Sequence, residues 1–352
     1  MAVEKLEKDW VKYPILHLDL NIEKYDTPDS LDNILDKSLT AWEKLYGAEP
    51  SERSFSLRFA GIIERACKQA GQRVVILVDE YDKPMLQAIG NEELQRQFRN
   101  ALKPFYGALK TMDGCIKFAF LTGVTKFGKV SVFSDLNNLD DISMRKDYVE
   151  LCGVSDRELH DTLDAELHEF ADVRGVTYDK LCAELKECYD GYHFTHNSIG
   201  MYNPFSLLNA FKYKEFGSYW FETGTPTYLV SLLKKHHYDL ERMAHEETDA
   251  QVLNSIDSES TNPIPVIYQS GYLTIKGYDE EFGIYRLGFP NREVEEGFVR
   301  FMLPYYANVN KVESPFEIQK FVREVRSGDY DSFFRRLQSF FADTTYEVIR
   351  DQ

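Results

Sequence analysis

The sequence has no long hydrophobic run and little cysteine, and both shortages exclude whole classes of protein. Its longest uninterrupted apolar segment is Val74–Val78, far short of the roughly 20 residues that a membrane-spanning helix needs. The five cysteines form no CxxC pair, which argues against a disulfide scaffold or zinc cluster and favours a reducing compartment. The charged start, Met1 to Lys12, lacks the apolar core of a secretory signal. We therefore expect a cytoplasmic protein without membrane association.

Positive charge is also in short supply. Lysine and arginine total 41 against 58 acidic residues, which gives a net charge of −17. Such a chain is repelled by phosphate backbones on average, so we do not expect direct nucleic-acid binding. A nucleotide is an anion too, and a site for one would need a focused lysine, backbone N–H groups or a metal ion. The length of 352 residues indicates more than one domain.

Three short apolar segments divide the first part of the chain, and helical patterns separate them. The strand-like segments are 15–20, 74–78 and 116–121, and the helical ones are 30–46, 55–70 and 91–109. This alternation predicts an α/β fold with a parallel sheet and right-handed crossovers over about residues 1–150. The continuous β-branched run at 74–78 predicts a strand buried on both faces.

The rest of the chain has a different pattern. Helical segments are expected at 155–170, opened by a Ser155–Glu158 capping box, and at 178–189, 204–212 and 226–235. A hairpin follows at 272–278 and 284–289, and then a helix at 294–303. Residues 151–310 are therefore predicted to form a helical and winged-helix-like domain. Acidic residues 241–262 suggest a linker, and residues 311–352 a helical tail.

The strongest chemical signal is the acidic pair that follows the second strand. An apolar strand ending in Asp79-Glu80 has the Walker B pattern, in which the first carboxylate holds magnesium and the second is the general base that polarises the attacking water. The alternative is an ordinary acidic turn after a buried strand. Asp82 and Lys83 add a third carboxylate and a cation to the same loop. We predict that both contribute to cofactor binding, with a solvated Lys83 as the alternative.

The third strand ends in a second group of polar residues. Thr122 and Thr125 are placed to sense a γ-phosphate, and Lys126 to neutralise its charge. The alternative is a Thr-Gly turn kept for its backbone geometry. Gly123–Lys129 also spells GxxxxGK, but Val130 stands where a phosphate loop needs Ser or Thr. We interpret that match as a coincidence.

Another cluster of metal-ligating residue types occurs later in the chain. His193 and His196 share a turn-rich segment with Cys188 and Asp190. The spacing is loose for a metal site, and a turn explains the segment.

Several long motifs resemble the AAA-ATPase-like proteins of anaerobic bacteria. They include YPILHLDLN, VVILVDEYDKPML, FAFLTGVTKFGKVSVF, YNPFSLLNA, YWFETGTPTYLV and YRLGFPNREVEEGF, and the resemblance extends from about Trp10 to Phe341. It implies a P-loop ATPase core, a helical lid and a C-terminal nuclease-like domain. Asp79 and Glu80 fall on the family's Walker B positions, Thr122 on its sensor strand and Lys126 in its TGVTKF motif.

The resemblance also implies two missing parts. The family's phosphate loop should precede Met1, and its nuclease core should follow Gln352. With the P-loop strand expected between the Walker B and sensor strands, its loss would leave an empty slot in the sheet. We expect that these strands close on each other, that Met1–Lys12 or a partner fills the slot, or that the natural protein is longer.

Two functions follow from these observations. The first is an AAA-ATPase-like module that binds and hydrolyses ATP with Mg²⁺ in its full-length parent and is impaired in this chain. The second is a non-catalytic module with a truncated nucleotide site, which binds a protein partner or itself. Whether the chain acts as an enzyme depends on which of these holds.

Overall fold

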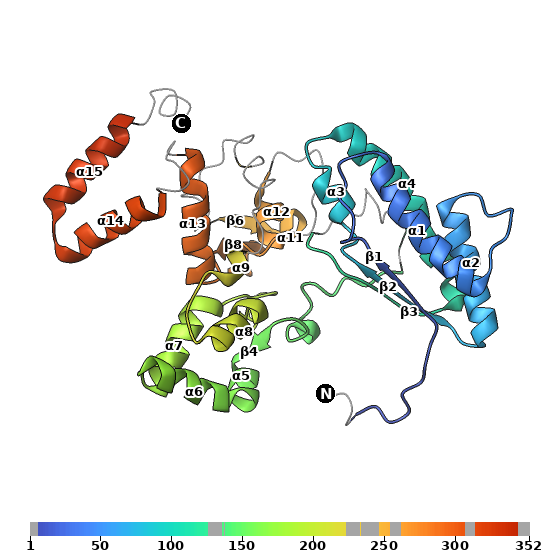
Figure 1. The fold of residues 1–352 in the computed structure, drawn as a ribbon, viewed down its shortest axis with the longest axis horizontal. Helices are drawn as coiled ribbons and strands as arrows, with labels where there is room; N and C mark the ends of the chain where they lie inside the picture. Colours follow the sequence, from blue (N-terminus) through green and yellow to red (C-terminus); the bar gives the residue numbers. More distant parts are fainter. Residues whose placement is uncertain are drawn as a thin grey trace. The chain divides into compact units, whose positions relative to one another are not determined.

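A computed structural model describes residues 6–125, 136, 138–222, 233, 246–253, 262–306 and 314–343 (Figure 1). The chain divides into two compact units. Unit 1 combines residues 1–141 with 250–270, and unit 2 combines 142–249 with 271–352. Each unit is therefore assembled from two separate stretches of sequence. The division into residues 1–150, 151–310 and 311–352 stays a prediction.

Unit 1 is built on a parallel sheet whose strand order is β1-β2-β3. Its strands are β1 (Ile15–Asp19), β2 (Val74–Asp79) and β3 (Ile116–Leu121). The other elements of unit 1 are α1 (Asp29–Tyr46), α2 (Phe55–Ala70), α3 (Lys83–Gln87), α4 (Glu92–Thr111), the 3₁₀ turn η2 (Asp113–Cys115), α11 (Ala250–Leu253) and α12 (Ile264–Gln269). The predicted α/β fold with a parallel sheet is confirmed.

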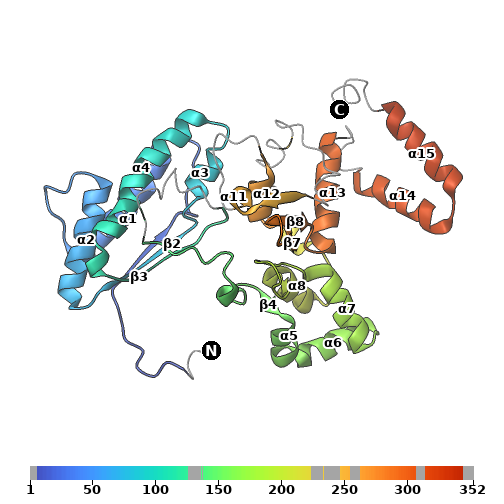
Figure 2. The same cartoon turned by 180° about the vertical axis from the view of Figure 1, so that it is seen from behind.

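The long helices of unit 1 cover one side of this sheet. Figures 1 and 2 show α1, α2 and α4 on the same side. The strand residues on that side are fully or almost fully buried, and they are Leu16, Leu18, Val74, Ile76 and Val78. Burial of each such side chain contributes about 1.5–3 kcal/mol, so this layer supplies most of the core around the sheet.

The opposite side of the sheet is much less covered. Ile15 and Phe118 are 56% and 55% exposed, and both pair with Val75, which is half-buried. The expectation that the second strand is buried on both faces is therefore wrong. β2 lies centrally between two strands, but its alternate residues Val75 and Leu77 are only half-buried. A continuous apolar run does not by itself reveal which faces the rest of the chain will cover.

The expected empty slot in the sheet is also not found. β2 hydrogen-bonds directly to β3 through the register Val75↔Phe118 to Val78↔Leu121. The Walker B and sensor strands are thus closed on each other, which is the first of the three outcomes expected. Direct pairing satisfies the backbone groups that an open slot would have left without partners. An additional strand could join this sheet only at an outer edge.

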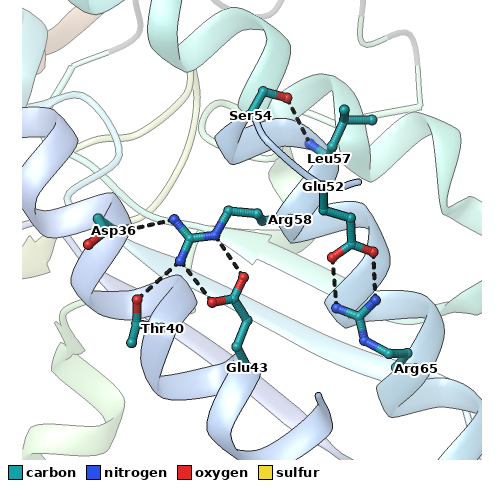
Figure 3. Close-up of polar contacts among 8 residues, drawn as sticks. All are labelled: Asp36, Thr40, Glu43, Glu52, Ser54, Leu57, Arg58 and Arg65. Carbon is teal, nitrogen blue, oxygen red and sulfur yellow. Dashed lines mark hydrogen bonds and ion pairs between the residues drawn. The ribbon is translucent and has the colours of Figure 1, made fainter. Parts of the chain in front are cut away.

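Ion pairs fasten α2 on the covered side (Figure 3). The Arg58 guanidinium donates to Glu43 at 2.7 and 2.9 Å, to Asp36 at 2.6 Å and to Thr40 at 3.1 Å, all three on α1. Near the middle of α2, Arg65 makes a second bidentate pair, with Glu52 of the preceding loop, at 2.6 and 2.9 Å. The Arg58 contacts fix the orientation of α2 relative to α1, and the Arg65 pair holds α2 to the loop that precedes it.

A capping residue and a glycine at a close approach complete the fastening of α2. Ser54 caps its first turn by accepting from Leu57 N at 3.3 Å. A Cβ at Gly61 would collide with the Glu52 carboxylate, so glycine makes room for the pair between Glu52 and Arg65.

Unit 2 is largely helical in its first stretch and mixed in its second. Its elements are η3 (Lys146–Tyr148), β4 (Val154–Ser155), α5 (Asp156–Thr162), α6 (Asp164–Arg174), α7 (Tyr178–Tyr189), β5 (Met201–Tyr202), α8 (Pro204–Tyr213), α9 (Tyr219–Glu222), β6 (Glu247–Asp249), β7 (Thr274–Asp279), β8 (Ile284–Gly288), α13 (Arg292–Tyr306), α14 (Ser314–Ser327) and α15 (Tyr330–Asp343). An antiparallel sheet in the order β6-β8-β7 contains the predicted hairpin.

Two local predictions in unit 2 have different outcomes. The capping box forms as expected, with Ser155 accepting from Glu158 N and the Glu158 carboxylate accepting from Ser155 N. The single helix expected at 155–170 is instead two helices, because Leu163, with φ −116° and ψ 20°, interrupts the helical backbone between α5 and α6.

Other expectations for this region concern residues that the structure describes only in part. The helix expected at 226–235 lies almost entirely outside the described residues. So does most of the linker expected at 241–262, but its described part forms strand β6 and helix α11 instead of a linker. The winged-helix-like arrangement stays a prediction. In the described part of the chain, every helix is too short or too polar to cross a membrane.

Candidate functional site

The C-terminal edge of the parallel sheet gathers the polar residues that follow its strands. Asp19 ends β1 and pairs in register with Asp79, which ends β2. Thr122 directly follows β3, and its N–H donates to Val78 O at 2.9 Å. Because the three strands are parallel, their carboxyl ends meet at one edge, where open α/β sheets bind ligands.

Asp79 and Thr122 make the central contact of this edge. The Thr122 hydroxyl donates to Asp79 Oδ1 at 2.6 Å, and Glu80 N donates to the same oxygen at 3.1 Å. The Asp79 residue is exposed, so its carboxylate is accessible from solution while one oxygen is held in place. The two residues that the sequence assigns to magnesium and to phosphate sensing therefore touch each other.

Glu80 has an unusual backbone and a perturbed carboxylate. Its φ of 55° lies in the left-handed region, which is uncommon for residues other than glycine and costs on the order of 1–3 kcal/mol. Burial raises the pKa of the half-buried Glu80 carboxylate, and the charges of Asp82 and Asp79 raise it further, while Lys83 acts in the opposite direction. A carboxylate with a raised pKa is a better proton acceptor near neutral pH.

Asp82 is turned away from solvent and holds the loop after β3. It is 1% exposed, and its carboxylate accepts from Val124 N at 3.2 Å, from Thr125 N and from the Thr125 hydroxyl at 2.6 Å. Burial raises the pKa of Asp82, against the opposing effect of the bonds from Thr125 and Val124. Both carboxylate oxygens are thus engaged within the protein. We call this contact between the loops after β2 and β3 the Asp82 latch.

Two neighbours complete the Asp82 latch. The Tyr81 hydroxyl donates to Thr125 O at 2.7 Å, and Tyr81 N donates to Thr122 O at 2.9 Å. A Cβ at Gly123 would collide with the Asp82 carboxylate and come within 2.9 Å of the Tyr81 ring. Glycine at position 123 therefore permits the close approach of the two loops, which is the backbone role that the sequence left open as an alternative.

Lys83 connects the loop after β2 to the end of β1. Its Nζ donates to the backbone oxygen of Asn21 at 2.6 Å and to Asn21 Oδ1 at 2.7 Å. Asn21 N in turn donates to Asp19 Oδ1 at 2.7 Å. Lys83 is therefore occupied by the protein's own oxygens rather than solvated alone.

Sequence reasoning missed Asp19 and Asn21. The signal was present, because the first strand also runs from apolar residues into an acidic residue, in HLDLN. Lys126 and the rest of the GxxxxGK segment after Thr125 lie outside the described residues.

Metal binding at this edge would depend mainly on Asp79. Among the described residues, no group of three or more His, Cys, Asp or Glu side chains is arranged to hold a metal ion. Magnesium is commonly held by one or two carboxylates together with water and substrate phosphates. Asp79 fits that kind of partial site.

Two residues of the His–Cys segment in unit 2 make contacts within the fold. Cys188 accepts from Arg292 Nη2 at 2.7 Å, and His193 Nδ1 lies 2.9 Å from Ser198 O. Among the described residues, Asp190 Oδ1 and His196 Nδ1 are buried with no hydrogen-bond partner, and His196 lies in the turn that the sequence predicts for this segment.

Comparison with known proteins gives two matches. Residues 1–133 match the family model described as predicted AAA-ATPase. The chain is also 35% identical over 302 residues to a protein of Azotobacter chroococcum mcd 1, described as an uncharacterized protein in the vnfD 5' region. That match covers 85% of this chain and 56% of the relative, so the chain spans little more than half the relative's length. Residues 1–133 contain the sheet and its polar edge, and their match supports the assignment of this part of the chain to the AAA-ATPase-like family.

Proposed function

We propose that this chain is the nucleotide module of an AAA-ATPase-like protein that binds ATP with Mg²⁺ and hydrolyses it in a longer form. The observation that carries the proposal is the hydrogen bond from Thr122 to Asp79, beside Glu80. In this assignment Asp79 holds the magnesium shell, Glu80 is the general base and Thr122 contacts the γ-phosphate.

The remaining residues support these three in different ways. Thr125 and Asp82 would set the position of the Thr122 loop through the Asp82 latch rather than touch the nucleotide. Lys83 would keep the loop after β2 at the end of β1. Lys126, which follows the latch in sequence, is proposed to neutralise phosphate charge.

The order in which the chain forms its strands suggests where the strand of a phosphate loop would join the sheet. The chain advances from β1 to β2 to β3 in one direction, and right-handed crossovers in one direction put all connecting helices on one face. A helix that covers the other face must therefore belong to a crossover that moves back across the sheet, in the direction from β3 towards β1. A strand that precedes β1 and lies beside the outer edge of β3 would provide such a crossover, and its helix would cover Ile15 and Phe118.

This arrangement accounts for an impaired site in the chain alone. Asp19, Asp79 and Glu80 place negative charge at the edge, and ATP adds more. Backbone N–H groups and a lysine of a phosphate loop would supply the missing positive potential. The chain by itself is therefore expected to bind Mg-ATP weakly.

A second candidate, a non-catalytic interaction module, is favoured by one specific observation. The exposed Ile15 and Phe118 lie on either side of Val75 across the sheet. Parallel sheets are usually covered on both faces, so a protein partner or a second copy could bind this side.

Calorimetric titration of the folded chain with Mg-ATP separates the candidates. We expect weak binding that Asp79→Ala lowers by about tenfold or more, about 1.4 kcal/mol. Glu80→Gln should keep the binding and abolish any turnover. The control is Glu92→Gln, which changes an exposed carboxylate at the start of α4. Binding that is equal in Asp79→Ala and the control would overturn the assignment, and no binding by the folded chain would favour the interaction module.

A further inference from the structure

Helices α14 and α15 of unit 2 form a hairpin whose turn is specified by its own sequence. Gly328 ends α14 with a φ of 74°, and its N–H donates to Val325 O at 3.1 Å while Asp329 N donates to Glu324 O at 2.9 Å, as in a Schellman motif. The Asp329 carboxylate then caps α15 by accepting from Ser332 N at 3.1 Å. Figures 1 and 2 show the two helices running in nearly opposite directions. We call this element the α14–α15 hairpin.

The inner side of the hairpin holds its two helices together without forming a core. The rings of Phe321 and Phe333 meet edge to face, with centroids 5.5 Å apart. Beside them the Glu324 carboxylate accepts from Arg336 Nη2 at 2.6 Å and from Arg336 Nε at 3.0 Å. None of the side chains described in the hairpin, at 319–338, is buried. Because isolated helices of 14 residues are marginal, the hairpin gains stability when another surface covers it.

The exposed apolar residues of the hairpin lie on one face. In each helix the residue after the inward-facing phenylalanine is apolar, Val322 in α14 and Phe334 in α15. Each step along an α-helix turns by about 100°, and in antiparallel helices that turn leads away from the facing residues to the same side of the hairpin. Val325 lies three residues from Val322, and Tyr330 four from Phe334, so both share this side. We call these four residues, which are 41–62% exposed, the apolar hairpin face.

Two opposite charges border the apolar hairpin face near the turn. Arg326 lies four residues from Val322 on α14, and Asp331 lies three residues from Phe334 on α15, so both adjoin this face. Both are exposed. Residues 314–343 contain five basic and five acidic residues, whose formal charges cancel, although the whole chain carries −17. Two copies of this acidic chain therefore repel each other less at the hairpin than they do on average.

We propose that the apolar hairpin face is an interface at which two copies of this chain pair as a four-helix bundle. A two-fold axis along the hairpin places α14 of each copy over α15 of the other, with both turns at the same end. Val322 of one copy then meets Phe334 of the other, since each lies six residues from Gly328. The same symmetry brings Arg326 of each copy beside Asp331 of the other, which gives two equivalent ion pairs. A face that carries both members of each pair is complementary to a second copy of itself.

Sedimentation equilibrium of the full chain tests the pairing. We expect a reversible equilibrium between monomer and dimer, whose dissociation constant Phe334→Asp raises about tenfold or more because it places a charge in an apolar interface. The control is Val173→Asp, which introduces the same charge at a residue of α6 that is 63% exposed. A chain that stays monomeric at every concentration would overturn the proposal. So would a dimer on which Phe334→Asp and Val173→Asp have equal effects.

A charge exchange tests the symmetry of the dimer. Arg326→Asp and Asp331→Arg each set two like charges against each other and should raise the dissociation constant about threefold or more. A chain that carries both substitutions has the two charges exchanged and should recover the dissociation constant of the wild type. A double variant that dimerises no better than the single variants would contradict the proposed pairing. Both positions are exposed, so this series decides the question even if Phe334→Asp fails to fold.

Discussion

The two sides of the unit 1 sheet are made by the same three strands but differ in how far their side chains are buried. On one side, Ile76 and its neighbours are buried under three helices. On the other, Ile15 and Phe118 remain more than half exposed. In each strand, successive side chains point to opposite faces of the sheet, whether or not a helix covers that face. The burial of a strand side chain therefore depends on which elements pack against its face of the sheet. A hydrophobic strand pattern shows only that the face is apolar enough to be covered.

The largest expected effect comes from comparing two adjacent residues of β2. Ile76 is 1% exposed on the covered side, while Leu77 is half-buried on the other side. Ile76→Ala should lower the free energy of unfolding by about 2–5 kcal/mol because it leaves a cavity in the core. Leu77→Ala should cost less than about half of that. Urea unfolding of both variants measures the difference, and equal losses would mean that both faces are covered in solution.

The next effect concerns the polar edge that the two faces share. Asp82→Asn replaces an acceptor oxygen with an N–H₂ group that cannot accept from Val124 N or Thr125 N. Leaving a buried backbone donor without a partner costs about 1–3 kcal/mol. We expect a loss of this size by urea unfolding near pH 3.8, below the raised folded pKa of Asp82, where the cost of burying its charge is small. A neutral substitution would show that the loop after β3 does not depend on the Asp82 latch.

Asp82 also predicts a pH dependence with a definite sign. Its folded pKa is raised above 3.8, so the folded state binds the proton more tightly than the unfolded state. Its contribution to stability is therefore present at low pH and falls as the pH rises from about 3.8 through the raised folded value. Urea unfolding across this window should show that fall in the wild type and not in Asp82→Asn. The same slope in both proteins would assign it to other groups.

The smallest expected effect concerns the contacts of Arg58, which hold α2 against α1 on the covered side of the sheet. Arg58→Lys keeps the charge but loses the fork that reaches Glu43, Asp36 and Thr40, and should cost about 0.5–1.5 kcal/mol. Arg96→Lys is the matched control, since the pair of Arg96 with Glu93 is exposed and should contribute at most about 0.5 kcal/mol. Thermal unfolding at low and high salt compares them. Indistinguishable losses would make the Arg58 cluster an ordinary surface feature.

The features that the sequence predicted well are local or periodic. The strands at 15–20, 74–78 and 116–121 lie within about a residue of β1, β2 and β3, because short β-branched runs between helical patterns have few other interpretations. The capping box of Ser155 was predictable, since both partners lie within one turn. The placement of Asp79 and Thr122 at one edge followed from parallel strands alone.

The features that escaped prediction depend on distant parts of the chain. The hydrogen bonds of Asp82 to the Thr125 loop and of Lys83 to Asn21 both join residues tens of positions apart. No periodicity encodes such contacts. The uncovered side of β2 was missed for the same reason. The proposed roles of Asp79, Glu80 and Thr122 in nucleotide chemistry are still predictions, and the titrations described above test them.

The interrupted course of unit 1 has a consequence for how the protein is made. Its two stretches end at residues 141 and 270, with a long stretch of unit 2 between them. At about 5–20 residues per second, a ribosome needs roughly 6–26 s to cover that interval. The sheet and its long helices thus wait for α11 and α12, while unit 2 waits for residues after 270. The completion of the two units during synthesis is therefore interleaved in time.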